Sequence, residues 1–242
     1  MKVKQYSEDS LTVNLGSEID EKINKQLVQL KSAVTELNLE GITDIVLSYT
    51  SLIIYFDVLK ADSKKITGAV KALELRELKD REYAYKVVKI PVCYGGEFGP
   101  DLARFKENGL TPEDVISMHS NKEYLVYMLG FMPGFPFLGG LSDKLFKARL
   151  DSPRMKIQAG TVGIGGRQTG IYPFDSPGGW NLLGRTPVPL YDSSRDNAIL
   201  YEAGDRIIFT SIDEREYYRI KEAYDKGEYT VETEYRGEAD GA

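Results

Sequence analysis

Polar side chains are spaced among glycines and prolines in residues 128–187, a stretch that also holds the one tryptophan of the chain. Glycine reaches backbone angles closed to other residues and proline fixes φ, so this alternation specifies a set path when apolar residues lie between. Small-molecule sites combine apolar walls with a few aimed polar groups. The candidates for substrate binding are Arg167, Gln168, Thr169, Tyr172, Trp180, Asn181 and Arg185.

Two of these candidates could bind an anion. Arg167 and Arg185 stand in glycine-rich surroundings, where backbone can close around a ligand, and a guanidinium fork suits carboxylate or phosphate. The alternative is that each arginine braces a loop by pairing with Asp175 or Asp192. Tight barrel corners also use glycine-rich loops with aromatic plugs, so the whole stretch could be architecture without a ligand.

Proton transfer is expected from His119 or Asp175. His119 follows an apolar helical pattern and precedes Ser120, so its imidazole could cap a helix end or point into the cleft as a proton carrier. Tyr172 and Trp180 are expected to form the wall of the site, and Trp180 is the stronger candidate because it lies between a glycine and an asparagine.

Several mechanisms require patterns that this sequence lacks. It contains no GxxxxGK[ST] phosphate loop, no GxSxG nucleophile elbow and no HExxH motif. Gly163 to Gly166 resembles half of a dinucleotide loop, but Gln168 and the absence of a clean βα crossover argue against it. One cysteine, Cys93, and one histidine cannot build a Cys/His zinc cluster, so we expect no metal site. Cys93 ends an apolar strand, which favours a buried structural thiol.

The composition indicates a globular protein. The chain has 242 residues, of which 42% are hydrophobic, and a net charge of −6 from 31 Lys and Arg against 37 Asp and Glu. A nucleic-acid partner is not expected, because phosphate binding shows as a basic patch. No run of about 18 apolar residues predicts a membrane span, and no signal-length apolar run follows the N-terminus, so a cytoplasmic location is expected.

The N-terminal third predicts a small α/β unit over residues 1–84. Its apolar spacing indicates a strand at 10–16, a helix beginning near Ser17, a hairpin at 42–57 and a second helix at 63–77. A further strand at 85–91 would complete a ferredoxin-like sandwich. The charged run 76–81 is a candidate boundary, and a solvated helix end is the alternative.

The second part, residues 85–228, predicts a barrel or sandwich because short strand patterns alternate with Gly and Pro turns. Strands are expected at 124–129, 188–191, 198–201 and 206–210. Thr111 before Pro112 and Asp114 marks a helix start, and Asp213 with Glu216 marks another in capping-box spacing. Residues 229–242 are acidic and small, and are expected to be a frayed tail.

The motifs of this second part resemble those of a known family, that of the B subunit of 5-oxoprolinase, which includes the KipI-type histidine-kinase inhibitors and proteins described as allophanate hydrolase subunit 1. The resemblance covers residues 91–209 and is carried by VCYGGEFGPDL, YLVYMLGFMPGFPFLGGL, AGTVGIGGRQTGIYPFDSPGGWNLLGRTP and AGDRIIF. The chain departs from the family pattern at Gln158, where proline is usual, and at Thr161, where serine is usual.

This resemblance implies an α+β chain in which a cyclophilin-like β-barrel follows the smaller α/β domain. It also implies partners, the C and A subunits of 5-oxoprolinase, with which the B subunit opens 5-oxoproline to glutamate at the expense of ATP with Mg, and no activity of the isolated chain. The alternatives are inhibition of a sporulation sensor histidine kinase and a non-catalytic scaffold for the C subunit. Allophanate hydrolysis ranks lower because no Ser-Ser-Lys amidase pattern is present. The residues expected to meet a partner are Phe131, Phe135 and Phe137.

Overall fold

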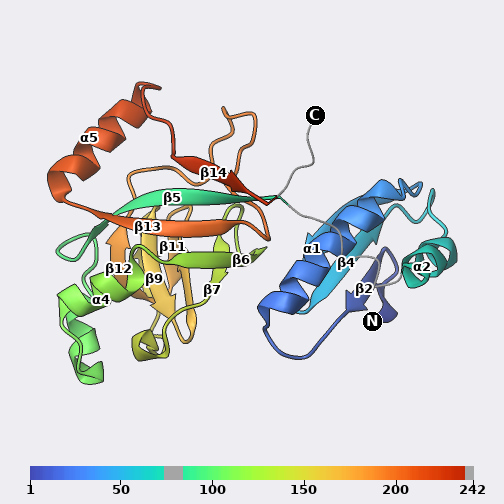
Figure 1. Ribbon diagram of the computed structural model, residues 1–242, viewed down its shortest axis with the longest axis horizontal. Coiled ribbons are helices and arrows are strands. Elements are labelled where there is room, and N and C mark those ends of the chain that lie inside the picture. The colour runs from blue at the N-terminus through green and yellow to red at the C-terminus, as the bar shows by residue number, and fades with distance from the viewer. Residues whose placement is uncertain (74–83, 238–242) are drawn as a thin grey trace. The chain divides into compact units, whose positions relative to one another are not determined.

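The computed structural model describes residues 1–73 and 84–237 (Figure 1). The chain divides into two compact units, Met1–Ala84 with Gly237–Ala242, and Tyr85–Arg236. The charged run 76–81, interpreted above as a boundary, lies outside the described residues.

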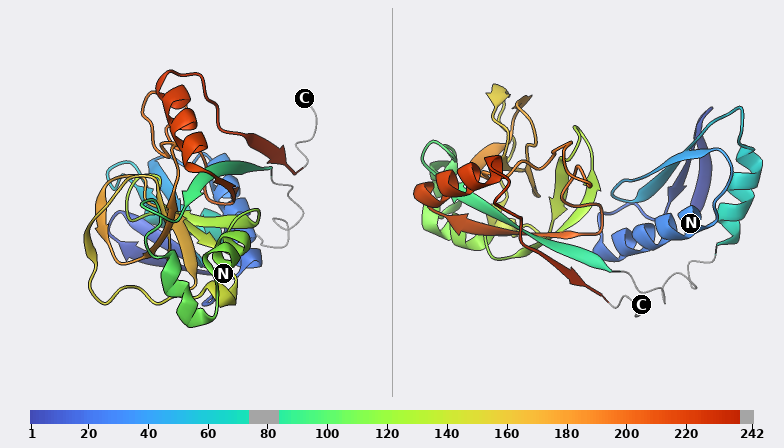
Figure 2. Two further views of the ribbon diagram at one scale, coloured as in Figure 1. Left: turned by 90° about the vertical axis from the view of Figure 1, so that its left-hand side faces the viewer. Right: turned by 90° about the horizontal axis from the view of Figure 1, so that it is seen from above.

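The N-terminal unit is a four-stranded antiparallel sheet with helices packed on it. The strands have the order β1-β2-β4-β3, and α1 lies along one face of the sheet (Figure 2). Its elements are β1 (Lys2–Ser7), β2 (Ser10–Asn14), α1 (Glu21–Glu36), β3 (Ile42–Leu47), β4 (Ser51–Phe56) and α2 (Ser63–Ala72).

Helix α1 forms where the sequence predicts an amphipathic helix, but it begins three residues later than the predicted start. Asp20 is the N-cap, and its carboxylate accepts hydrogen bonds from the amides of Lys22 and Ile23. The apolar stripe of the helix packs on β3 and β4, with Leu27 and Leu30 fully buried. Helix α2 ends at Ala72, and the remainder of the helix predicted to reach residue 77 lies outside the described residues.

The C-terminal unit is a closed β-barrel. Among the described residues, seven strands form the ring β12-β9-β10-β7-β6-β13-β5, and β5 pairs with β12 to close it. The ring strands are β5 (Tyr85–Tyr94), β6 (Glu123–Leu129), β7 (Pro136–Gly139), β9 (Thr161–Gly165), β10 (Gln168–Ile171), β12 (Asn181–Arg185) and β13 (Arg206–Ile212). Beside the ring, β8 (Arg154–Ile157) and β11 (Ser176–Gly178) form a separate two-stranded ribbon.

Strand β5 corrects the prediction for residues 85–91. The strand does not complete the N-terminal sheet, because it pairs in parallel with β13 and closes the barrel through β12. Its side chains are apolar on both faces, and Val88, Ile90 and Val92 belong to the barrel core. The fourth place in the N-terminal sheet is taken by β1, whose polar and exposed sequence gave no strand signal.

The predicted frayed tail is wrong for β14 (Thr233–Arg236). This strand pairs antiparallel with the first half of β5, and Val231 just before it is buried in the barrel core. Its acidic residues are tied by charge, since Glu234 pairs with Arg236 at 2.8 Å. Period-two patterns are weak in so short a strand, and main-chain pairing with β5 is what orders it.

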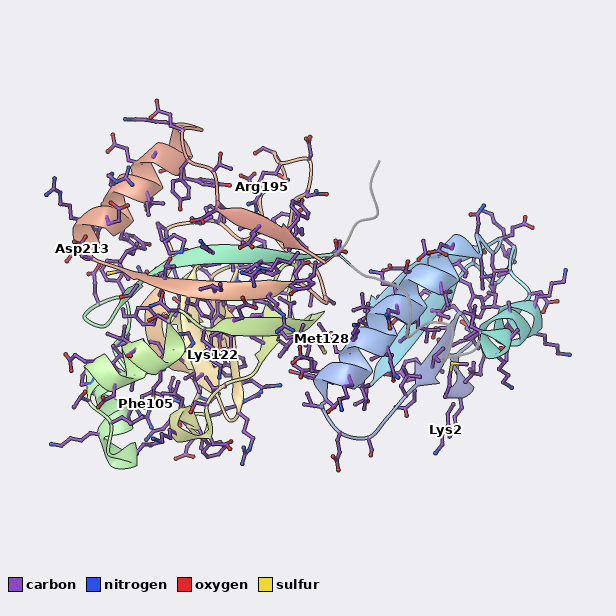
Figure 3. The ribbon with its side chains drawn as sticks, viewed as in Figure 1. Lys2, Phe105, Lys122, Met128, Arg195 and Asp213 are labelled. Atoms are coloured by element: carbon purple, nitrogen blue, oxygen red, sulfur yellow. The ribbon has the colours of Figure 1, made fainter. Side chains whose placement is uncertain are left out.

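The helices of the barrel unit begin where capping residues predict. Helix α4 (Pro112–His119) has Thr111 as N-cap in a complete capping box, and α5 (Glu214–Asp225) begins after Asp213 (Figure 3). The short helices are 3-10 turns, η1 (Leu102–Asn108) and η2 (Asp143–Leu145). The strands predicted at 188–191 and 198–201 reduce to one bridge between Tyr191 and Ile199, while 206–210 lies within β13.

Candidate functional site

One cavity of about 290 Å³ lies in the stretch that the sequence singles out. It opens between the turn after β6, the segment before β8 and the β11 end of the ribbon. Its walls are mainly aromatic side chains and proline rings, with one charged residue. The lining residues are Phe131, Phe135, Phe137, Arg149, Pro153, Tyr172, Pro177, Gly178, Gly179 and Trp180.

Phe135 is the centre of the aromatic wall. It packs edge-on against Tyr172 and Trp180, with ring centroids 5.3 and 5.4 Å apart, and it also contacts Phe137 at 4.9 Å and Phe131 at 5.5 Å. Edge-to-face pairs of this kind each add about 0.5–1.5 kcal/mol beyond buried area. Of these residues only Tyr172 and Trp180 were predicted as the wall, whereas the three phenylalanines were predicted to meet a partner. Phe135 is buried and cannot itself be a surface contact for a partner.

Phe131 is the exposed member of this set. Its side chain is 66% exposed, and its backbone has a φ of 69°, in the left-handed region that residues other than glycine rarely adopt. The turn is held in place because the Tyr201 hydroxyl donates to the Gly134 carbonyl at 2.8 Å. A bulky residue kept in an unfavourable conformation at a cavity rim is typical of functional loops.

Glycine positions the tryptophan. The indole of Trp180 lies directly on β9, where a Cβ atom at Gly165 would be 2.3 Å from the indole Nε1, closer than atoms can approach. Gly170 on the neighbouring strand β10 would place a Cβ 3.1 Å from the same ring. Because neither glycine has a side chain, Gly165 and Gly170 leave room for the indole that forms the cavity wall.

Two arginines that sequence reasoning missed lie beside the wall. Arg154 is neutralised by the buried Asp101, at 2.7 Å, and its second nitrogen donates to the Trp180 carbonyl. The other oxygen of Asp101 accepts from the Leu182 amide at 2.7 Å. Arg149 lines the cavity with its guanidinium 5.8 Å from the Trp180 ring centroid. Within residues 1–73 and 84–237 it has no ion-pair partner.

The backbone on both sides of Arg149 is held to the barrel. Asn181, which is fully buried, donates from Nδ2 to the Ala148 carbonyl at 2.9 Å, and the Leu150 amide donates to the Gly179 carbonyl at 2.7 Å. Asn181 was predicted to orient substrate. Its contacts instead orient the segment that carries Arg149 beside the wall.

His119 lies in the core rather than in the cavity. Its Nδ1 is 2.8 Å from the Tyr94 hydroxyl and its Nε2 is 2.8 Å from Thr169 Oγ1. Thr169 donates its one hydroxyl proton to the Gly163 carbonyl, so Nε2 carries the imidazole proton and Nδ1 accepts from Tyr94. Burial lowers the pKa of His119 to about 3, which keeps the ring neutral. With zero exposure it caps no helix end and reaches no cleft.

The two predicted anion-binding arginines do not form one site. Arg185 pairs opposite Thr161 at one end of β9, whereas Arg167 follows Gly165 at the other end, and a five-residue strand separates such ends by about 13 Å. Arg167 is exposed and ion-paired with Asp143, and it lies over the Phe146 ring. Arg185 lies over the Phe98 ring at 5.3 Å and donates to the Glu97 carbonyl at 3.4 Å. Among the described residues neither arginine forms the ion pair with Asp175 or Asp192 that the bracing alternative expected.

Asp175 and Gln168 also lie away from the cavity lining. Asp175 is ion-paired with Lys156 at 2.8 Å and accepts from the Ala159 amide, and the hydrogen bond from Lys156 lowers its pKa, so it is ionised and exposed. Gln168 is half-buried in β10 opposite Gly165. The structure therefore groups Tyr172, Trp180 and the three phenylalanines, and separates them from the other candidates.

Two features are absent from the described part of the chain. No group of three or more His, Cys, Asp or Glu residues there could hold a metal ion. None of the described helices is long and apolar enough to cross a membrane.

Known proteins are similar to this chain in sequence. The family described as "Carboxyltransferase domain, subdomain C and D" matches residues 1–201. The chain is 40% identical to the 5-oxoprolinase B subunit of Bacillus subtilis strain 168, over 91% of this chain and 96% of that protein. It is 44% identical to the 5-oxoprolinase B subunit of Haemophilus influenzae, over 70% of this chain and 79% of that protein.

Solved structures superpose on this chain. The crystal structure of TTHA0988 superposes with a TM-score of 0.75 at 35% identity and covers 84% of this chain, which spans 40% of that longer chain. The K. lactis urea amidolyase superposes with a TM-score of 0.78 at 23% identity, over 97% of this chain and 16% of that one, a likeness of fold alone. The chain belongs to the carboxyltransferase subdomain C and D family, and the relatives it matches at 40–44% identity are named as the B subunit of 5-oxoprolinase.

Proposed function

We propose that this chain is the B subunit of an ATP-dependent 5-oxoprolinase that opens 5-oxoproline to glutamate together with partner subunits. The observation that carries the proposal is the likeness to the B subunit of the Bacillus subtilis enzyme along 96% of its length. A likeness of that extent includes the cavity stretch as well as both units of the fold. The C and A subunits of 5-oxoprolinase are the proposed partners, and the cytoplasm is the proposed location.

The cavity gives the chain a chemical role in this reaction. Opening a five-membered lactam requires that the ring be held in place and shielded from bulk water while its amide is activated. Tyr172 and Trp180 supply flat, rigid surfaces for a small ring, and Phe135 packs behind them. Burial raises the pKa of Tyr172 to about 12, so its hydroxyl stays protonated and can donate at neutral pH.

ATP with Mg is the proposed cofactor of the assembled complex. Among the described residues no group of three or more His, Cys, Asp or Glu could hold a metal ion, and the sequence has no GxxxxGK[ST] phosphate loop, so this chain offers no evident site for the nucleotide by itself.

Reconstitution tests the proposal. The chain is combined with the A and C subunits from the same genome, and 5-oxoproline-dependent ADP release and glutamate formation are measured together. We expect both products only when all three proteins are present. A complete mixture of folded proteins that forms no glutamate, or a mixture that works equally well without this chain, would refute the proposal.

A second candidate function rests on the rim of the cavity. Phe131 at the cavity is 66% exposed, and Met155 on β8 is 89% exposed, and exposed apolar side chains of this kind suit protein docking. A histidine-kinase inhibitor or a scaffold for the C subunit of 5-oxoprolinase could use this rim. Autophosphorylation of sensor kinases from the same genome, measured with increasing amounts of the chain, separates these roles, because only the inhibitor slows the kinase.

The N-terminal unit is proposed to be ferredoxin-like. The order β2-β4-β3 with its two helices supports this, with β1 in the place that the last strand takes in a split βαβ sheet. The barrel is proposed to be cyclophilin-like.

A further inference from the structure

Arg149 is the one charged residue that lines the aromatic cavity. Arg154, which donates to the Trp180 carbonyl beside the cavity, is ion-paired with Asp101, and Asp101 also accepts a hydrogen bond from the Leu182 amide. No carboxylate of the described residues pairs with Arg149. A guanidinium that faces an apolar cavity without a counterion favours an anionic ligand.

The backbone at Arg149 is held in place by the fold, although the side chain itself is exposed. Asn181 and the Gly179 carbonyl hold the backbone directly before and after it. Asn181 is fully buried and directly follows Trp180, the tryptophan of the wall. The same short segment of chain therefore holds both the flat wall and the backbone that carries the cation, and the guanidinium lies 5.8 Å from the Trp180 ring centroid, an arrangement that suits a ligand with a flat body and one acidic group.

We propose that Arg149 determines the specificity of the cavity for small monocarboxylates with a flat, uncharged ring, by pairing with the ligand carboxylate while Trp180 and Tyr172 contact the ring. A volume of about 290 Å³ is at the small end of the range for ligand sites, roughly 300–1,000 Å³, which suits a single ring rather than a nucleotide. The assignment of 5-oxoproline as the ligand rests on the proposed function, and it replaces the anion-binding role predicted for Arg167 and Arg185.

The chain carries its own probe for this site. Trp180 is its one tryptophan and forms part of the wall, so intrinsic tryptophan fluorescence reports directly on occupation of the cavity. The full chain is titrated with 5-oxoproline, with 2-pyrrolidinone, which is the same lactam without the carboxylate, and with 5-oxoprolinamide, in which the carboxylate is a neutral amide. Ionic strength is held constant in all titrations.

Two matched variants separate the site from the rest of the surface. Arg149→Gln removes the cation from the cavity. Arg167→Gln removes an arginine that likewise lies over an aromatic ring, Phe146, but outside the cavity. We expect a saturable change with 5-oxoproline in the unmodified chain and in Arg167→Gln, and at least tenfold weaker binding in Arg149→Gln. Both neutral lactams should bind at least tenfold more weakly than 5-oxoproline.

Three results would overturn the inference. They are no saturable response of the unmodified chain to 5-oxoproline, equal affinity for the acid and its amide, and unchanged affinity in Arg149→Gln. Arg149 is exposed and makes no hydrogen bond with another described residue, so equal unfolding midpoints of the two variants verify that a loss of binding is not a loss of fold.

The assembled complex distinguishes this inference from the function on which it rests. There Arg149→Gln should raise the KM for 5-oxoproline at least tenfold. An unchanged KM in an active complex refutes the role of Arg149 and leaves the proposed function in place. A complex that is inactive with the unmodified chain refutes the proposed function, whereas carboxylate-selective binding by the isolated chain still supports the role of Arg149.

Discussion

The burial of His119 predicts how the stability of the barrel changes with pH. His119 is the one histidine of the chain, and burial lowers its pKa from the usual 6.5 to about 3. Between these two values the unfolded chain binds a proton that the folded barrel does not. Stability is therefore complete above about pH 6.5 and is lost as the pH falls toward 3.

The size of the effect follows from the two pKa values. Between pH 7 and pH 5 the unfolded histidine becomes almost fully protonated while the folded one stays neutral, which lowers the free energy of unfolding by about 2 kcal/mol. His119→Gln abolishes this contribution, because an amide does not titrate. Tyr94→Phe is the matched control, since it removes one hydrogen bond of the imidazole but leaves the ring buried and titratable.

Urea unfolding followed by Trp180 fluorescence measures the effect at pH 5 and pH 7, and it reports on the barrel unit alone because that unit holds the tryptophan. The unmodified chain and Tyr94→Phe should lose about 2 kcal/mol more than His119→Gln over this interval. If all three lose the same amount, the imidazole accepts a proton in the folded barrel, and the interpretation of His119 as a neutral core residue is refuted.

Three further variants test other parts of the barrel. Gly165→Ala places a methyl group against the Trp180 indole, so we expect a loss of about 1–3 kcal/mol in urea unfolding and a shifted fluorescence maximum, and an unshifted maximum would mean that the indole does not pack there. Asp101→Asn removes the charge that pairs with Arg154 and should destabilise by about 2 kcal/mol, most of which the double variant with Arg154→Met should restore. Deleting residues 231–242 removes β14 and should cost about 2 kcal/mol or more, whereas a frayed tail would cost nothing.

Local signals in the sequence predicted local structure well. Thr111 before Pro112 gave the start of α4, and Asp213 gave the start of α5, because capping depends on residues within one turn of each other. Tyr172 and Trp180, which were predicted as a wall from their place in one glycine-rich stretch, do line the cavity, whereas Phe135 was predicted as a partner contact.

Pairing between distant residues was not predictable. Residues 85–91 read as a strand, but nothing local tells such a strand which sheet it joins, and the parallel partner β13 lies far along the chain. The same limit explains why the charged residue of the cavity was not predicted. Arg149 stands in a stretch without glycine, so no local signal marked it as a site residue. Arg167 and Arg185 are near in sequence to the wall but lie at opposite ends of β9.

Closure of the barrel through β5 has a consequence for synthesis of the protein. The amide of Lys86, at the start of this strand, bonds to Asp205 across 119 residues. At translation rates of about 5–20 residues per second, β5 remains without its parallel neighbour β13 for roughly 6–24 s after it leaves the ribosome. The strands of the N-terminal sheet have all emerged by Phe56 and face no such delay. A nascent chain that ends before Ile212 therefore carries an apolar strand with an unpaired edge, and ribosome-associated chaperones bind substrates of this kind.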